Sequence, residues 1–297
     1  MPRPAPGRRA AAGCALALLL VELAGNGSAA ESITVTFLET SDLHGHVLPW
    51  DEVRRRAADV GLARVATRVA AIRRVAPNVF LLDAGDTIEG TPEEFLQAHR
   101  AAYAALLSHE RAPDADPMAR AMSLMGYDAM AVGNHEFDFG LDVLRKAQKE
   151  SSFPWLSANT RRSKDGAPAF PEYVVRTAGG VRIGVLGLTT PGVPGWEPER
   201  NRPGLVFEDP VVTAKRLVPV LRGRERCDFV VVLIHSGLDV DRKAGVPDGT
   251  GSENRVAALA REVSGIDLIL MGYTLDISAL YSLTLPYLKP LPAYILP

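Results

Sequence analysis

Metal-capable side chains follow four apolar runs of this chain, each at the point where the run ends. They are Asp42, His44, Asp86, Asn134 and His235. Carboxylate, amide and imidazole groups form a nitrogen and oxygen ligand set that suits Mn, Zn, Fe, Co or Ni, unlike the thiolate set of a structural zinc site. A carboxylate has two oxygens, so Asp86 can bridge a pair of ions. Two divalent ions about 3.5–4 Å apart can activate a bridging hydroxide and clamp the oxygens of an in-line phosphoryl displacement.

Each of these residues also has a plainer explanation when it is taken alone. Asp42 or Asp86 can be a helix cap or a turn residue, and His235 can be a hydrogen-bonded histidine of the core. The metal interpretation is favoured because four strand ends carry the same chemistry together.

His135 and Asp138 add a second chemical function. An imidazole beside metal ions can protonate a departing alkoxide, and a carboxylate three residues further on can orient the imidazolium and stabilise its charge. The alternative for this pair is a loop histidine with a turn-forming aspartate before the next helix.

The elements that must position these residues are strands that alternate with helices. The predicted strands are apolar runs without polar alternation, at 33–38, 79–82, 129–132, 181–188, 229–234 and 268–271. The predicted helices cover 60–75, 92–107, 117–125, 141–150, 210–222 and 253–263, with Thr91 and Asp116 as N-caps ahead of Pro92 and Pro117. Continuous apolar strands indicate burial on both faces, so we expect an α/β layered domain with its site at the strand ends.

The sequence resembles the calcineurin-like metallophosphoesterase superfamily. The blocks that carry the resemblance are Asp42-x-His44, Gly85-Asp86 and Gly133-Asn134-His135-Glu136. The fuller strings are similar to its 5′-nucleotidase and 2′,3′-cyclic-nucleotide phosphodiesterase branch: SDLHGH at 41–46, GDTIEGTP at 85–92 and GNHEFDFG at 133–140. The resemblance implies a four-layer α/β/β/α sandwich and the hydrolysis of nucleotides or related phosphate esters by a metal-bridging hydroxide.

The resemblance also implies a role for each site residue. One ion would take Asp42, His44 and Asp86, and the other would take Asp86, Asn134 and His235. Catalysis would use His135 paired with Asp138, and substrate binding would use Asn134 and His135. His46 is a candidate substrate contact, whereas His99 and His109 match no motif and are expected at the surface.

The pattern breaks at its last block, where the family has Gly-His-x-His. Tyr273 and Leu275 occupy the two histidine positions, so each ion would lose a ligand. We expect residues 276–297 to be an atypical tail, and we expect the chain to lack the second, nucleotide-binding domain that the resemblance implies. A frame disruption near codon 273 and a genuinely divergent terminus both explain this. An inactive homologue with weak metal or nucleotide binding is therefore an alternative to an active enzyme, and a thiosulfohydrolase-like enzyme of the same fold is a runner-up.

The first thirty residues resemble an export signal. Arg3, Arg8 and Arg9 form a positive head, and an apolar run at 10–21 leads to small residues that end at Ala30. The run is too short to span a membrane, which takes about 20 residues. We therefore expect a signal peptide at 1–30, an incomplete metallophosphoesterase domain at 31–275, and a periplasmic or secreted protein.

Composition argues against two further features, binding to nucleic acid polymers and an internal disulfide. A net charge of −2 argues against binding to nucleic acid polymers, which calls for a basic excess. Removing the signal leaves Cys227 alone, so the mature chain can form no internal disulfide, and we expect Cys227 to be a buried, inert thiol. Oligomeric state stays open at this point.

Overall fold

The computed structural model describes residues 17–24, 32–51, 54–102, 115–238, 253–272 and 294–296. The strands are β1 (Ala17–Ala24), β2 (Ser32–Thr40), β3 (Trp50–Asp51), β4 (Arg56–Ala57), β5 (Val79–Asp83), β6 (Ala129–Ala131), β7 (Trp155–Leu156), β8 (Thr160–Arg162), β9 (Tyr173–Ala178), β10 (Val181–Thr189), β11 (Leu205–Phe207), β12 (Phe229–His235), β13 (Leu268–Gly272) and β14 (Tyr294–Leu296). The helices are α1 (Leu62–Arg73), α2 (Pro92–Ala98), α4 (Pro117–Met125), α5 (Leu141–Glu150), α6 (Val193–Trp196), α7 (Pro210–Gly223) and α8 (Val256–Glu262), with single 3₁₀ turns at His135–Phe137 and Glu199–Asn201.

Two five-stranded sheets form the centre of the molecule. One has the strand order β1-β2-β5-β6-β7, and the other has the order β14-β13-β12-β10-β9. In the first sheet β2, β5, β6 and β7 run parallel, and β1 adds an antiparallel edge. In the second sheet β10, β12, β13 and β14 run parallel, and β9 adds an antiparallel edge. Parallel strands bring their carboxyl ends to one edge of each sheet, and the candidate site residues follow these ends.

The inner faces of the two sheets pack on each other. Phe37 of β2 stacks on Phe229 of β12 with ring centroids 5.8 Å apart. Leu82 and Val231 belong to the same buried cluster, which contains side chains from both sheets. Burial on this face and on the helix-covered face explains why the strand runs carry almost no polar residues.

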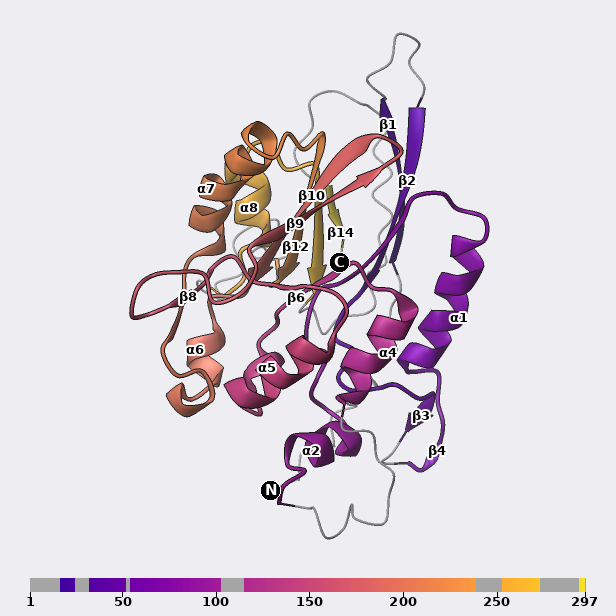
Figure 1. Ribbon diagram of the computed structural model, residues 1–297, viewed down its shortest axis with the longest axis vertical. Helices are drawn as coiled ribbons and strands as arrows, with labels where there is room; N and C mark the ends of the chain where they lie inside the picture. The colour runs from indigo at the N-terminus through magenta and orange to yellow at the C-terminus, as the bar shows by residue number, and fades with distance from the viewer. Residues whose placement is uncertain are drawn as a thin grey trace, which may run out of the picture.

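Helices cover the two outer faces. Leu62 of α1, Met122 of α4 and Leu144 of α5 are buried against the first sheet. Leu217 of α7 and Leu259 of α8 are buried against the second. Figure 1 shows the strands between these two groups of helices. The predicted four-layer α/β/β/α sandwich is therefore confirmed.

The predicted elements agree closely with the observed ones. All six predicted strands and all six predicted helices are present, and α4 and α5 have the predicted bounds. The predicted N-caps are confirmed, because the side chain of Thr91 accepts a hydrogen bond from Glu94 N and that of Asp116 accepts one from Ala119 N.

Helix α2 is shorter than predicted. It ends at Ala98, and His99 leaves the helical conformation in a turn. The prediction of one helix over 92–107 is therefore wrong at residues 99–102, which form turns. Residues 103–107 and His109 lie outside the described residues.

Two strands fall in segments that the sequence assigned to other roles. Strand β1, within the predicted signal peptide, pairs antiparallel with β2 from Ala17 opposite Glu39 to Ala24 opposite Ser32. Strand β14, within the predicted tail, pairs parallel with β13. The backbone groups of the added strand pair with the free N–H and C=O groups at the open edge of a sheet, which is the physical reason for both pairings.

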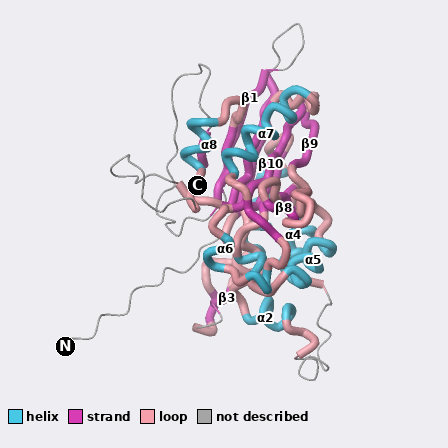
Figure 2. The backbone as a smooth tube through the Cα atoms, turned by 90° about the vertical axis from the view of Figure 1, so that its left-hand side faces the viewer, coloured by secondary structure: helices cyan, strands magenta, loops and turns pink. Residues whose placement is uncertain are grey.

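Figures 1 and 2 show α2 and β3 at the end of the molecule opposite the end that carries β1. None of the described helices is long and apolar enough to cross a membrane.

Candidate metal centre

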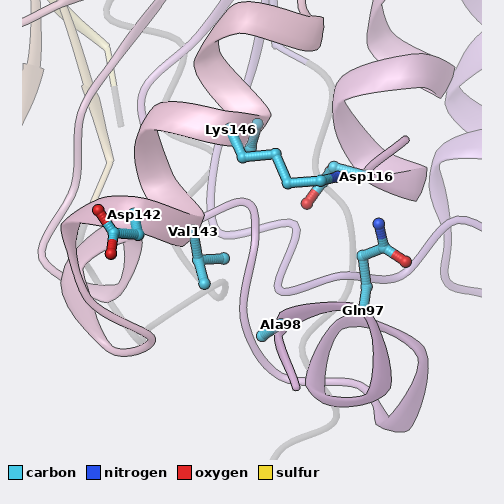
Figure 3. Close-up of a pocket in the computed structure, with 7 residues that line it drawn as sticks. Gln97, Ala98, Asp116, Asp142, Val143 and Lys146 are labelled. Carbon is cyan, nitrogen blue, oxygen red and sulfur yellow. The ribbon is translucent and has the colours of Figure 1, made fainter. Parts of the chain in front are cut away.

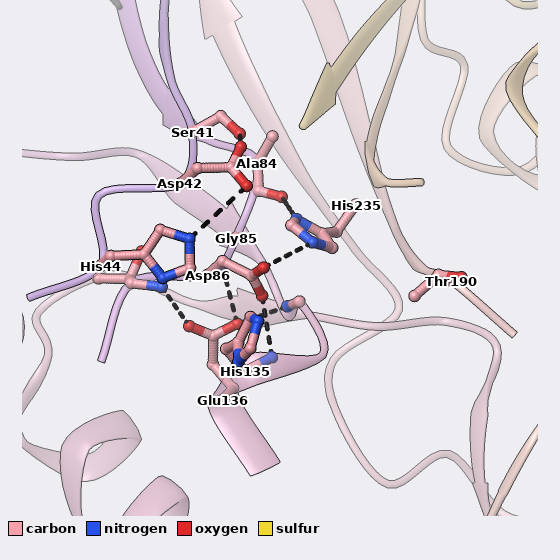
Figure 4. A network of polar contacts seen from close by, with 12 residues as sticks. Ser41, Asp42, His44, Ala84, Gly85, Asp86, His135, Glu136, Thr190 and His235 are labelled. Carbon is pink, nitrogen blue, oxygen red and sulfur yellow. Dashed lines mark hydrogen bonds and ion pairs between the residues drawn. The ribbon is translucent and has the colours of Figure 1, made fainter. Parts of the chain in front are cut away.

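Three side chains from three different strand ends meet in the structure. Asp42 follows β2, Asp86 follows β5, and His235 is the last residue of β12. Their ligand atoms all lie within 4.8 Å of one another (Figure 4). Residues that are far apart in the sequence thus form one compact group of two carboxylates and an imidazole.

His235 is oriented by a backbone carbonyl. Its Nδ1 lies 2.8 Å from the carbonyl oxygen of Ala84, so Nδ1–H donates there and Nε2 faces Asp86, 3.0 Å from Oδ2. A carbonyl partner on the other ring nitrogen is the usual way in which proteins fix a metal-binding histidine. The side chain of His235 is fully buried.

The electrostatics of this pair suit a cation. Burial opposes the charge on His235, but the Asp86 carboxylate outweighs it and raises the pKa of His235 to about 10. Burial likewise opposes the charge on Asp86, whereas His235 lowers the pKa of Asp86 to about 2. A divalent ion placed between the two groups would replace the proton of His235, so binding would release protons.

The loops that present the ligands adopt an uncommon backbone conformation. Asp42, His44 and Asp86 have φ values of 52°, 43° and 61°. Non-glycine residues rarely adopt the left-handed region, and such residues cluster at functional sites. Backbone hydrogen bonds hold the two loops together: Asp42 N donates to Gly85 O at 3.0 Å, and His44 N donates to Asp86 O at 3.0 Å.

Glu136 is a fully buried carboxylate behind these loops. Its two oxygens accept hydrogen bonds from Asp86 N at 3.0 Å, Thr87 N at 2.6 Å and Gly133 N at 2.6 Å. Burial, followed by the nearby Asp86, raises the pKa of Glu136. Glu136 therefore fixes the Asp86 loop to the Asn134 loop, a role that sequence reasoning missed although Glu136 is part of the third motif.

Gly133 allows this close approach of the loops. A Cβ atom at this position would lie 2.7 Å from Asp86 N and 2.9 Å from Glu136 Oε2, and would overlap Asp86 Oδ1. Only glycine leaves that space free.

The amide oxygen of Asn134 indicates whether the cluster of Asp42, Asp86 and His235 suits a metal ion. Its Oδ1 atom is buried and has no hydrogen-bond partner among the described residues. A buried polar atom without a partner costs about 1–3 kcal/mol, a penalty that a bound cation would remove. The nitrogen and oxygen donor set and this unsatisfied amide oxygen both fit a divalent ion.

His135 and Asp138 are in contact, as the sequence analysis expected. His135 Nδ1 lies 2.9 Å from Asp138 Oδ2, and His135 N donates to Asp86 Oδ1 at 2.9 Å. The hydrogen bond to Asp138 is the main cause that raises the pKa of His135 to about 9, against the effect of burial. His135 is therefore protonated at neutral pH beside the Asp86 group.

Glu89 joins the two histidines that flank the site. Its Oε2 atom lies 3.4 Å from His44 Nδ1 and 3.7 Å from His135 Nδ1. The Nε2 atom of His44 lies 4.0 Å from Asp42 Oδ1. Sequence reasoning missed Glu89 because an acidic residue in a loop carries no signal of its own.

The remaining sequence-predicted positions are partly outside the described residues. Tyr273 and Leu275 lie outside the described residues. Gly272, the last residue of β13, lies close to Ser41 and Ala84, where a Cβ atom would overlap Ser41 Oγ. His46 is half-buried, and its Nδ1 lies 3.2 Å from the carbonyl oxygen of Leu43.

Two other expectations concern residues away from the centre. Cys227 is buried, and burial raises the pKa of its thiol, as expected for an unreactive cysteine. His99 was expected at the surface, but it is half-buried because its ring contacts those of Phe95 and Phe139.

A small cavity lies between α2 and α5. Its volume is about 170 Å³, and Figure 3 shows Gln97, Asp116, Asp142 and Lys146 around it. The residues that line it include none of the candidate metal ligands.

Comparison with known proteins identifies the family of this chain. A model of the calcineurin-like phosphoesterase family matches residues 35–272. A 2′,3′-cyclic-nucleotide 2′-phosphodiesterase/3′-nucleotidase of Yersinia enterocolitica is 33% identical over 264 residues, which cover 86% of this chain and 38% of that protein. A 5′-nucleotidase of Vibrio vulnificus is 34% identical over 246 residues, which cover 81% of this chain and 40% of that protein.

A solved structure agrees with these relatives. The calcineurin-like phosphoesterase YfkN from Bacillus subtilis superimposes with a TM-score of 0.69 at 29% identity, over 80% of this chain and 71% of that chain. The chain thus spans about two fifths of the length of the two curated relatives.

Proposed function

Because the chain belongs to the calcineurin-like phosphoesterase family, we propose that it is a metal-dependent hydrolase of nucleotide phosphate esters. The observation that carries the proposal is the meeting of Asp42, Asp86 and His235 from three separate strand ends. The names of the two curated relatives, both of which act on nucleotides, support the substrate class.

The residues proposed to hold two divalent ions are Asp42, His44, Asp86, Asn134 and His235, with Asp86 shared. The chemistry that such ions supply when bound is polarisation of a phosphoryl oxygen and activation of a water as the nucleophile. The unsatisfied Asn134 Oδ1 and the fixed orientation of His235 support this assignment.

His135 is proposed to act as the general acid. Because Nδ1–H donates to Asp138, Nε2 can hold the proton that the departing oxygen needs. Asp138 keeps the ring oriented and keeps it charged, and the pKa of His135 at about 9 supports this role. Asn134 and His135 are proposed to contact the phosphate of the substrate.

We further propose that residues 1–30 direct export, so that the enzyme works in the periplasm or outside the cell. The basic head and the apolar run that follows it support this proposal. The mass of the exported protein tests it: a chain that begins at Glu31 is expected, and an exported chain that keeps residue 1 contradicts it.

The test of the main proposal is a turnover assay with matched variants. Purified chain with Mn²⁺ is expected to release phosphate from 5′-AMP or 3′-AMP, or to open 2′,3′-cyclic AMP to a monoester. For the cyclic substrate alone, a phosphomonoesterase is added afterwards so that the product can be detected as phosphate. Tyr273→His together with Leu275→His is expected to increase turnover and Mn²⁺ affinity, because the pair would restore one ligand to each ion.

Two outcomes would count against it. No turnover by either chain, with Mn²⁺ bound weakly or not at all, favours the inactive homologue. Turnover that survives Asp86→Ala contradicts the assigned centre.

A further inference from the structure

We propose that Thr189 is a positioning residue that fixes the separation of Asn134 and His235, two proposed ligands of one ion that come from different sheets. The proposal rests on the proposed function and adds how the ligands of that ion are held in place. Thr189 is the last residue of β10 and is fully buried.

Thr189 is fixed in the second sheet beside His235. Strands β10 and β12 pair parallel, with Thr189 opposite His235. The buried side chain of Asn159 holds the backbone of Thr189 at two points. Its Oδ1 accepts a hydrogen bond from Thr189 N at 2.8 Å, and its Nδ2 donates one to Thr189 O at 2.8 Å. The end of β10 therefore keeps one position relative to the strand that carries His235.

The hydroxyl group of Thr189 reaches the first sheet. Its Oγ1 donates a hydrogen bond to the carbonyl oxygen of Val132 at 2.6 Å. Val132 directly follows β6 and stands two positions before Asn134. One hydrogen bond thus connects the neighbour of His235 in the second sheet with the segment of the first sheet that leads to Asn134.

Gly187 allows the two sheets to come this close. It lies two residues before Thr189 in β10, and a Cβ atom there would overlap Leu156 Cβ of β7. The backbones are in direct contact at this point, since Ala158 N donates to Gly187 O at 2.8 Å. Only glycine leaves room for such an approach, which brings the short side chain of Thr189 within reach of the first sheet.

The bond to Val132 is the last of a directed series of hydroxyl groups. Ser157 Oγ lies 2.7 Å from Thr189 Oγ1 and 2.6 Å from Thr160 Oγ1. A hydroxyl has one proton, and a carbonyl oxygen can only accept. Because Thr189 gives its proton to Val132, Ser157 donates to Thr189, and Thr160 donates to Ser157. All three side chains are fully buried, and a buried polar network with its bonds made holds the elements that it connects rigidly.

The consequence falls on one of the two proposed ions. Asn134 Oδ1, which is buried without a hydrogen-bond partner among the described residues, and His235 have to stand at one separation to bind the same ion. The bond between Thr189 and Val132 fixes the strand ends that carry these two ligands. The ligands that belong to the other ion alone follow β2, and backbone bonds to the loop after β5 hold them instead.

Thr189→Val tests the proposal, because it removes the hydroxyl and keeps the shape of the side chain. In a calorimetric titration with Mn²⁺, one of the two affinities is expected to fall about tenfold, and the other is expected to stay unchanged. Thr189→Ser keeps the hydroxyl and is expected to restore the weakened affinity. Electron paramagnetic resonance gives a second readout. Wild type is expected to show an exchange-coupled Mn²⁺ pair, and Thr189→Val, at the same metal loading, is expected to show uncoupled ions.

The matched control is Thr213→Val in α7. Thr213 is also fully buried, and its hydroxyl donates to Glu208 Oε2 at 3.2 Å, away from the centre. This variant is expected to lower the urea midpoint and to leave both Mn²⁺ affinities unchanged. Two unchanged affinities in Thr189→Val, or an equal loss in Thr213→Val, would overturn the proposal, while the proposed function would stand.

Hydrogen exchange decides the case without metal. The amides of Gly133 and His135, in the loop after Val132, are hydrogen-bonded. In metal-free protein, Thr189→Val is expected to speed their exchange about tenfold, whereas Thr189→Ser and Thr213→Val are expected to match wild type. Unchanged exchange in Thr189→Val overturns the proposal. A wild-type chain that binds no ion contradicts the proposed function instead, and the exchange rates still decide whether Thr189 holds this loop.

Discussion

At the scale of single residues, the centre depends on hydrogen bonds that fix each ring. His235 donates through Nδ1 to Ala84, and His135 donates through Nδ1 to Asp138. Each imidazole therefore has Nε2 available, which under the proposed function would bind an ion in the case of His235 and protonate a leaving oxygen in the case of His135.

The acid role of His135 predicts a dependence on the leaving group. His135→Ala is expected to lower kcat for 5′-AMP about 10²- to 10⁴-fold, because an alkoxide needs a proton to depart. The loss for p-nitrophenyl phosphate is expected to be much smaller, since nitrophenolate leaves without help. Steady-state kinetics on both substrates measure the ratio. Equal losses would mean that His135 acts in binding or folding and not as an acid.

Glu89 predicts an effect on metal affinity. Glu89→Ala is expected to weaken Mn²⁺ binding about 10- to 100-fold, because His44 would lose the carboxylate beside its Nδ1 atom. Calorimetric titration gives the affinity. Glu89→Gln keeps an oxygen acceptor and is expected to fall between wild type and Glu89→Ala, whereas unchanged affinity in both variants would contradict the role.

At the scale of elements, the strands could be predicted from the sequence, but the backbone conformation of the loops that follow them could not. The ligand-bearing strands were predicted because continuous apolar runs such as 229–234 mark buried strands and each is followed by a polar residue. The left-handed backbone of Asp42, His44 and Asp86 was not predicted, because contacts between two distant loops impose it.

Short elements with mixed exposure were also missed. Strand β9 (Tyr173–Ala178) is half-exposed along its length, so its sequence lacks both an apolar run and a clean alternation. Helix α2 was extended too far because the pattern that follows Ala98 remains helical in composition. Tertiary contacts decide such segments, and a single sequence does not contain that information.

The loops are joined by Glu136, which gives a prediction on stability. Glu136→Ala is expected to lower the free energy of unfolding by about 3 kcal/mol, because the backbone N–H groups of Asp86, Thr87 and Gly133 would stay buried without acceptors. Urea denaturation measures it. Glu262→Ala, an exposed carboxylate paired with Lys215, is the control and is expected to change stability by about 0.5 kcal/mol at most. A loss as small as that for Glu136→Ala would contradict the role.

The interaction of Glu94 in α2 with Asp116, the N-cap of α4, predicts that stability depends on pH. Burial, followed by the charge of Asp116, raises the pKa of Glu94 to about 10. Because the folded state holds this proton more tightly than the unfolded state, its contribution to stability is full below about pH 4.5 and is lost as the pH rises toward 10.

Glu94→Gln is expected to remove this part of the decline, since glutamine stays neutral and can still donate to Asp116. The measurement is the urea midpoint of wild type and variant between pH 5 and pH 9. Glu93→Gln, at the exposed neighbouring position, is expected to follow wild type. A Glu94→Gln profile that is parallel to wild type would mean that Glu94 titrates normally.

At the scale of the whole molecule, the sandwich brings the carboxyl ends of two parallel sheets to one place. Asp42 and Asp86 come from the first sheet and His235 from the second, so the centre forms only when the two sheets are packed. The inter-sheet contact of Phe37 with Phe229 belongs to that packing. The strand ends were predicted because each motif follows its own strand, whereas the two-sheet sandwich was predicted only from the resemblance to the family.

The central claim is that Asp86 belongs to a centre that binds two divalent ions. Equilibrium dialysis against Mn²⁺, with metal content measured by mass spectrometry, tests it most directly in wild type and Asp86→Ala. The expected result is two ions per wild-type chain at saturation and less than one in Asp86→Ala, because the shared carboxylate serves both ions. An equal metal content in the two proteins would contradict the account.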